Sequence, residues 1–201
     1  MDKVLALAAA IITLPVSLVA AICIRIEDGG PVMFKQTRPG LHEQPFQLLK
    51  FRTMIVNADN CIDAKGEPTR RRITRTGRLL RSSSLDELPQ LINVLRGDMS
   101  VVGPRPILYE RAERLNPEQK RRFAIKPGIT GLAQISGRNQ IRWSERLKLD
   151  LEYVDHRGIG LDLKILFKTI KVVLFREGME LDANPGRVDD LPRAGEQGDD
   201  L

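Results

Sequence analysis

An uncharged stretch of 21 residues near the amino terminus, Val4–Ile24, constrains this chain more than any other feature. As a straight α-helix it would reach roughly 31 Å, at about 1.5 Å per residue, which is enough to cross the hydrocarbon core of a bilayer. Three interpretations compete: a secretory signal, a transmembrane span, and a re-entrant helix that enters and leaves the membrane on one side. The run is long for a signal and only Lys3 precedes it as a basic side chain, so the two membrane interpretations are favoured.

Pro15, near the middle of this run, bears on the choice between them. Proline removes a backbone hydrogen bond and kinks a helix, and Thr13 and Ser17 lie close enough to satisfy the freed carbonyl groups. Basic residues flank the run on both sides, which favours two cytoplasmic ends. From the local sequence, an ordinary span kinked by proline stays open beside a re-entrant helix that breaks at Pro15.

Composition narrows the classes of function. Two cysteines among 201 residues exclude a disulfide framework and a four-cysteine zinc site, and two distant histidines argue against a His-rich metal site. The formal net charge of +6 indicates an anionic partner, which could be nucleic acid, a membrane surface or a phosphorylated substrate. Only nine residues are aromatic, so platforms for stacking nucleic-acid bases are poorly supplied.

The charge is distributed unevenly along the chain. Asp182–Leu201 holds six acidic residues against two arginines, so the preceding 181 residues carry a net +10. Because this end also contains prolines and glycines and no aromatic residue, we predict that 177–201 is an acidic, disordered tail. The rest divides into a membrane helix over 1–26 and a folded domain over 27–176.

Hydrophobic patterning predicts an α+β architecture for that domain. Strands are predicted at 31–36 and 45–54, joined into a small hairpin by a turn that contains Pro39 and Gly40. A period of two places Lys50 and Arg52 side by side on one face of the second strand.

Helices are predicted at 143–154 and 161–175. The second is amphipathic, with an apolar side and a stripe of lysines. It fits equally an interfacial membrane helix and a core helix with a solvated lysine face.

A further helix is predicted after Ser84, because four apolar residues share one face: Leu88, Leu91, Ile92 and Leu95. Ser84 and Glu87 fit a capping box. Acidic residues are common in a first helical turn, where the macrodipole favours them. Spacing alone therefore gives Asp86 and Glu87 a purely structural explanation.

Arginines recur at three further places. Six of the twelve residues from Arg70 to Arg81 are arginine, which is typical of a solvated basic face or of contact with lipid headgroups. Arg105 stands between two prolines, and such a rigid cation suits phosphate recognition, although a plain turn has the same pattern. Arg138 lies in a predicted loop.

Several of these motifs, in this order, resemble the bacterial sugar transferase family, the monotopic phosphoglycosyl transferases. The resemblance covers about 4–176, which is nearly everything except the tail. The motifs that carry it are Lys50-Phe-Arg-Thr-Met, Leu85-Asp-Glu-Leu-Pro-Gln-Leu, Val102-Gly-Pro-Arg-Pro, Lys126-Pro-Gly-Ile-Thr-Gly and Gly137-Arg-Asn. The second of them, followed by Gly-Pro-Arg-Pro, is highly specific.

The resemblance implies a reaction and roles for the dyad. Sugar 1-phosphate would pass from a UDP-sugar to a polyprenol phosphate such as undecaprenyl phosphate, with release of UMP. Asp86 would be the nucleophile, forming a covalent aspartyl phosphosugar, with Glu87 beside it. Mg²⁺ would be held by Asp86 together with the diphosphate, and the membrane helix would be re-entrant and break at Pro15.

Physical chemistry adds two expectations. An ionised nucleophile is needed, and a helix N-terminus together with Arg81 is expected to lower the pKa of Asp86. The charge of the diphosphate must also be neutralised before an anion attacks it. The candidate cations are Lys50, Arg52, Arg81, Arg105 and Arg138.

The same resemblance sets the expected location and partners. The chain would act on the cytoplasmic face of the bacterial inner membrane, in the first membrane step of glycoconjugate synthesis. It would contact membrane lipid and both substrates but not nucleic acid, and a homodimer stays open. Two other interpretations are kept: a membrane-tethered basic module that binds nucleic acid, and a non-catalytic scaffold, against which the intact Asp86–Glu87 pair argues.

Overall fold

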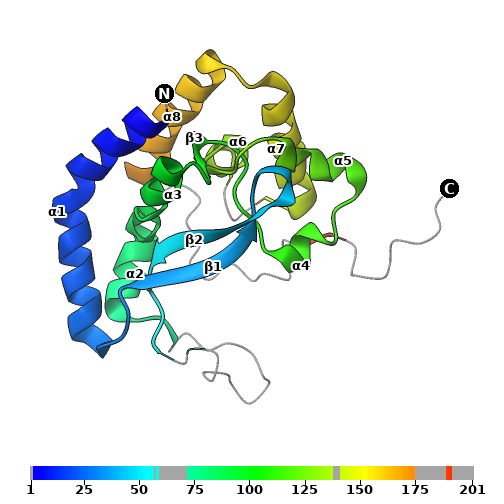
Figure 1. The fold of residues 1–201 in the computed structure, drawn as a ribbon. Helices are drawn as coiled ribbons and strands as arrows, with labels where there is room; N and C mark the ends of the chain where they lie inside the picture. Colours follow the sequence, from blue (N-terminus) through cyan, green and yellow to red (C-terminus); the bar gives the residue numbers. More distant parts are fainter. Residues whose placement is uncertain (1, 57, 59–71, 138–140, 175–188, 192–201) are drawn as a thin grey trace.

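The computed structural model describes residues 2–56, 58, 72–137, 141–174 and 189–191 of the chain (Figure 1). It confirms the predicted α+β architecture, in which helices predominate and the strands are short. In chain order the helices and strands are α1 (Asp2–Asp28), β1 (Met33–Pro39), η1 (Leu41–Glu43), β2 (Pro45–Phe51), α2 (Arg75–Ser82), η4 (Leu85–Glu87), α3 (Gln90–Arg96), β3 (Ser100–Val102), α4 (Tyr109–Ala112), α5 (Pro117–Lys120), η5 (Arg121–Ala124), β4 (Gly128–Thr130), α6 (Leu132–Ile135), α7 (Trp143–His156) and α8 (Ile159–Leu174).

The apolar run forms α1, which continues through Pro15 as a single helix. Figure 1 shows α1 as a curved helix whose middle stands away from the rest of the molecule. Its length and its mean hydropathy of 2.6 are sufficient for crossing a membrane. Only Ala6, Ala20 and Ile24 are buried along it, so most of its large apolar side chains are exposed.

Both ends of α1 are bound to the same folded body. At the start, the Ser100 hydroxyl of β3 donates a hydrogen bond of 2.6 Å to the Asp2 carboxylate. At the end, the Glu27 carboxylate accepts hydrogen bonds from the backbone N–H groups of Arg75 (2.6 Å) and Thr76 (2.9 Å). These two N–H groups belong to the first turn of α2, where a helix leaves its donors unpaired. The two ends of α1 are therefore held on one side of the curve.

The predicted hairpin is present. Strands β1 and β2 pair antiparallel, with Phe34 opposite Lys50 and Gln36 opposite Leu48. The turn between them contains His42 and Glu43 in the left-handed region, with φ of 52° and 60°. Beneath the hairpin, side chains of β2 join α1 and α3 in one apolar cluster: Ala6, Phe46, Leu48, Val94 and Met99.

A second, two-stranded sheet positions the segment that carries Arg105. Strands β3 and β4 run parallel, and the Gly103 N–H donates to the Thr130 carbonyl at 2.8 Å. A Cβ on Gly128 would lie only 2.1 Å from the backbone nitrogen of Gly103, so this close approach requires glycine. The Gly128 N–H in turn donates to the Pro104 carbonyl at 2.9 Å, which fixes the backbone next to Arg105.

The two predicted C-terminal helices are present as α7 and α8. In α8, Ile165 and Val172 are buried, whereas a row of large apolar residues is exposed: Ile159, Leu163, Phe167 and Ile170. Their spacing of three and four places them on one face of the helix. Thus α8 is neither a simple core helix nor a fully solvated one, because it buries one apolar face and exposes another.

Part of the predicted solvated tail is docked, which corrects the expectation for 177–201. The Arg114 guanidinium pairs with the Asp189 carboxylate at 3.0 Å, and the Ser144 N–H donates to the Asp190 carboxylate at 3.0 Å. Leu191 is 7% exposed and lies in an apolar cluster with Phe123. The residues that make these contacts belong to the same stretch whose composition predicts disorder. The rest of that range lies outside the described residues.

A buried ion pair connects η5 to α7. The Arg122 guanidinium lies 2.8 Å from the Asp150 carboxylate and also donates to the backbone carbonyl of Arg105 at 2.6 Å. Burial raises the pKa of Asp150 to about 6, although Arg122 and Arg146 oppose the shift. Arg122 therefore holds the backbone of Arg105 by a hydrogen bond, and the Asp150 carboxylate neutralises the charge of Arg122.

We expect Arg122→Met to lower the free energy of unfolding by about 3–5 kcal/mol at pH 8, because Asp150 would remain buried without its partner. The loss shrinks toward pH 5, where Asp150 takes up a proton in the folded protein. Arg121→Met is the matched control, since its ion pairs with Glu118 and Asp155 are exposed and screened by water, so their loss should change the stability far less. Denaturant titration in detergent measures the free energy of unfolding of both purified variants. Equal midpoints for the two variants would contradict this account.

Candidate active site

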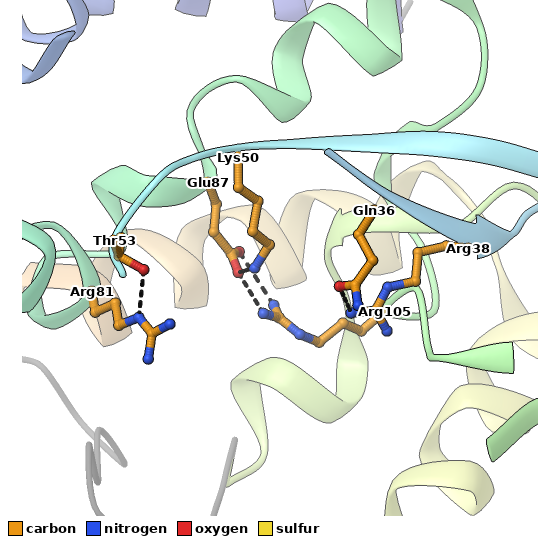
Figure 2. Close-up of polar contacts among 7 residues, drawn as sticks. All are labelled: Gln36, Arg38, Lys50, Thr53, Arg81, Glu87 and Arg105. Carbon is orange, nitrogen blue, oxygen red and sulfur yellow. Dashed lines mark hydrogen bonds and ion pairs between the residues drawn. The ribbon is translucent and has the colours of Figure 1, made fainter. Parts of the chain in front are cut away.

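Three segments that are distant in sequence meet at the Glu87 carboxylate (Figure 2). Lys50 of β2 donates to its Oε1 at 2.8 Å. Arg105 of the Pro-Arg-Pro loop forms a forked pair with both carboxylate oxygens, with 3.2 Å between Nη1 and Oε2. Burial opposes the charge of Glu87, but Arg105 and Lys50 outweigh that effect and hold the pKa of this carboxyl well below its usual range. Glu87 is therefore an anion fixed by two cations.

The segment that carries the dyad differs from the prediction. Asp86 and Glu87 lie in η4, one turn of 3₁₀-helix that precedes α3, rather than in the first turn of a longer α-helix. The predicted capping box is wrong, because Ser84 is left-handed (φ 58°) and its side chain caps nothing. The Glu87 carboxylate instead turns toward Lys50 and Arg105, since two full charges attract it more strongly than one N–H group does.

Asn93 of α3 ties this segment to the hairpin. Its side-chain oxygen accepts from the Leu49 N–H at 3.0 Å, and its side-chain nitrogen donates to the Gln47 carbonyl at 2.7 Å. The amide thus bonds to β2 as a neighbouring strand would, and it is fully buried. This link fixes the distance between Lys50 on β2 and the dyad just before α3.

Asp86 occupies a different electrostatic position from its neighbour. Among the described residues, no hydrogen bond or ion pair reaches its carboxylate, although Lys50, Arg105 and Arg81 act on it through space. Burial and the charge of Glu87 outweigh these cations and raise the pKa of Asp86. The expected lowering is therefore wrong, because α3 begins only at Gln90 and the adjacent Glu87 carboxylate repels a charge on Asp86.

Arg81 reaches this site from α2. Its Nε donates to the Thr53 hydroxyl at 2.8 Å, and burial lowers the pKa of its guanidinium while Asp86 opposes that shift. Helix α2 can lie this close because Gly77 packs directly on the backbone of Thr53, where a Cβ would come within 2.1 Å of the carbonyl oxygen. Figure 2 shows Arg81 beside the Glu87 cluster, with its terminal nitrogens unengaged by the residues drawn.

Two predicted cations are not part of this cluster. Arg52 is buried and forms an ion pair with Asp28 at the end of α1, whereas Lys50 pairs with Glu87. Arg138 lies outside the described residues.

Sequence reasoning missed several contributors. Asn93, Arg122 and Asp150 act through long-range contacts that leave no local pattern. Arg38 and Gln36 of β1 could have been found, because they alternate along the strand and share the face of Lys50 in the hairpin register. Figure 2 shows both beside Arg105.

Comparison with known proteins gives this cluster a context. The model of the family "Bacterial sugar transferase" matches residues 1–176. The chain belongs to the bacterial sugar transferase family. Membership makes it a transferase.

Three relatives illustrate the range of the family. The "Uncharacterized sugar transferase EpsL" of Bacillus subtilis (strain 168) is 52% identical over 78% of this chain and 77% of its own length. The "UDP-glucose:undecaprenyl-phosphate glucose-1-phosphate transferase" of Caulobacter vibrioides is 42% identical over 80% of this chain and 63% of its own. The "Undecaprenyl-phosphate galactose phosphotransferase" of Salmonella typhimurium is 43% identical over 75% and 35%. The chain therefore spans only part of the larger relatives.

Proposed function

We propose that this transferase moves sugar 1-phosphate from a UDP-sugar to a polyprenol phosphate and releases UMP. The names of the Caulobacter and Salmonella relatives support this reaction class. The observation that carries the proposal is the contrast within the dyad: Glu87 is neutralised by Lys50 and Arg105, whereas the adjacent Asp86 has no hydrogen-bond partner among the described residues.

Asp86 is the nucleophile in this mechanism. Its carboxylate attacks the phosphorus next to the sugar, an acyl phosphate forms, and the bond to UMP breaks. The lipid phosphate then attacks the same phosphorus and restores the carboxylate. The raised pKa makes Asp86 the more basic member of the dyad, which suits attack by its ionised form. Splitting the transfer lets one carboxylate serve two large anionic substrates in turn.

Glu87 is a positioning residue, and the cations around it receive the substrate. Because Glu87 fixes Lys50 and Arg105 in place, their remaining N–H groups are oriented before any diphosphate arrives. Arg81 acts on Asp86 through space and offers two further terminal nitrogens. The arrangement can thus neutralise charge on both sides of the attacked phosphorus without protein reorganisation.

The donors at this site fit Mg²⁺. Magnesium keeps several waters and is held by one or two carboxylates together with substrate phosphates, so no dense protein cage is needed. Among the described residues there is no cluster of three side chains suited to metal binding, which agrees with that mode. Asp86 would hold the ion with the diphosphate, and the bound ion would neutralise phosphate charge.

The membrane arrangement we propose is monotopic. Both ends of α1 are bonded to one folded body, through Asp2 and Glu27, so a straight crossing would have to break one set of contacts. The exposed apolar rows of α1 and α8 supply the lipid-contacting surface. Since UDP-sugars are cytoplasmic compounds, the domain faces the cytoplasm at the bacterial inner membrane, in the first membrane step of glycoconjugate synthesis.

We expect Asp86→Asn to abolish UMP release from a panel of UDP-sugars with undecaprenyl phosphate and Mg²⁺. Asp86→Glu should fail as well, because one extra methylene displaces the attacking oxygen by about 1 Å or more. Glu152→Gln, on an exposed part of α7, is the control for an exposed carboxylate and should retain activity. Near-normal UMP release by Asp86→Asn would overturn the assignment. Absence of release by the unmodified protein with every sugar would favour the scaffold or nucleic-acid interpretation.

A labelling experiment tests the re-entrant arrangement. In a background with Cys23 and Cys61 replaced by serine, one cysteine is placed before Met1 and another after Leu201. Neither should react with a membrane-impermeant maleimide in intact cells, and both should react after permeabilisation. Pro15→Leu should straighten α1 and move the first site toward the outside. Labelling of that site from outside with Pro15 intact would contradict the proposal.

A further inference from the structure

A second arginine lies beside Arg105 and takes no part in the Glu87 cluster. Arg38 stands at the end of β1, and Figure 2 shows its side chain extending toward that of Arg105. Its Nη2 donates to the Gln36 side-chain oxygen at 2.6 Å. Gln36 and Arg38 lie two residues apart on the strand, so one face of the hairpin presents both, on the same side as Lys50.

The charge of Arg38 lacks a carboxylate partner. Within the described part of the chain no acidic side chain forms an ion pair with it, and its Nε is buried without a hydrogen bond. Gln36, its hydrogen-bond partner, is neutral. Burial, followed by the like charges of Arg105 and Arg111, lowers the pKa of Arg38 to about 10, with only Glu110 opposing. Keeping a charged guanidinium half-buried without a carboxylate partner costs free energy, and a bound anion would offset that cost.

Further arginines lie in the surroundings of Arg38. Arg111 and Arg146 flank the Trp143 ring, at 4.3 Å and 4.9 Å from its centroid. Burial and the charges of Arg105 and Arg111 lower the pKa of Arg146. Arg105 is paired with Glu87 and Arg111 lies 3.7 Å from Asp189, and Asp150 opposes the shift of Arg146, so within the described residues Arg38 is the member of this group without a carboxylate partner.

We propose that Arg38, oriented by Gln36, is a second phosphate-binding arginine that shares a phosphoryl group of the substrates with Arg105. The inference rests on the proposed function and adds a residue to its substrate site. A planar guanidinium whose orientation is already fixed by one hydrogen bond loses little freedom on binding phosphate. Two sources supply this chemistry, the diphosphate of the UDP-sugar and the phosphate of the polyprenol, and the experiment distinguishes them.

The test measures binding before turnover. UDP and undecaprenyl phosphate are titrated separately into the full chain in detergent, with the unmodified protein and four variants: Arg38→Ala, Arg38→Lys, Gln36→Ala and Arg121→Ala. We expect Arg38→Ala to raise the Kd for one of the two ligands about 10- to 100-fold, the usual effect of losing a charged hydrogen bond. Arg38→Lys keeps the charge and should recover part of that loss. Arg121→Ala, whose ion pairs are with Glu118 and Asp155, should bind as the unmodified chain does.

Gln36 is tested as a positioning residue by steady-state kinetics. Gln36→Ala should raise KM for the same substrate several-fold with little change in kcat, because it loosens the guanidinium without removing it. If Gln36 had a purely structural role, Gln36→Ala would lower the melting temperature of the protein and would not raise KM selectively over kcat.

Each outcome has a defined meaning. A weaker affinity for UDP assigns Arg38 to the nucleotide diphosphate, and a weaker affinity for undecaprenyl phosphate alone assigns it to the lipid. Unchanged affinity for both ligands, in folded Arg38→Ala or Arg38→Lys, overturns the inference. If the unmodified chain binds UDP through Arg38 yet never releases UMP from any UDP-sugar, the proposed function falls and the phosphate site stands.

Discussion

The Glu87 carboxylate is the interaction on which the rest of the site depends. It joins β2, the turn before α3 and the loop after β3, through Lys50 and Arg105, and no other carboxylate among the described residues forms an ion pair with either cation. Without it, the two cations would face each other beside a half-buried aspartate. With it, the charges are balanced in pairs, and Asp86 is left as the carboxylate that is available for chemistry.

The scaffold around Glu87 serves to hold those three segments at fixed separation. The Asn93 amide fixes α3 to β2, and the close approach of Gly103 and Gly128 fixes the loop before Arg105. Arg122 then supports the Arg105 backbone from beneath, with Asp150 as its counter-ion. Each support is buried and polar, so each is costly to break, which is the property required of groups that hold charges in place before a substrate arrives.

Local patterns in the sequence predicted a good part of this architecture. The hairpin and the two C-terminal helices follow from periodicity, and the motifs around Lys50, the dyad and Arg105 identified the residues that meet. The predictions that failed concern residues whose contacts are with residues far away along the chain. Arg52 pairs with Asp28 instead of the site, Ser84 turns left-handed instead of capping a helix, and Asp189–Leu191 dock against α4 and α7. In each case a contact between distant residues outweighs a local preference, and no spacing rule contains that information.

In the proposed mechanism, Asp86 forms a covalent bond to the phosphosugar. The most direct measurement is intact-mass analysis after rapid quenching of the enzyme with Mg²⁺ and its UDP-sugar, in the absence of lipid. The account predicts release of at most one UMP per active site and a protein that gains the mass of one phosphosugar, carried by the peptide that contains Asp86. Strict dependence of the first UMP on lipid, with no mass gain, would mean direct transfer between the substrates and would leave Asp86 as a metal ligand or a base.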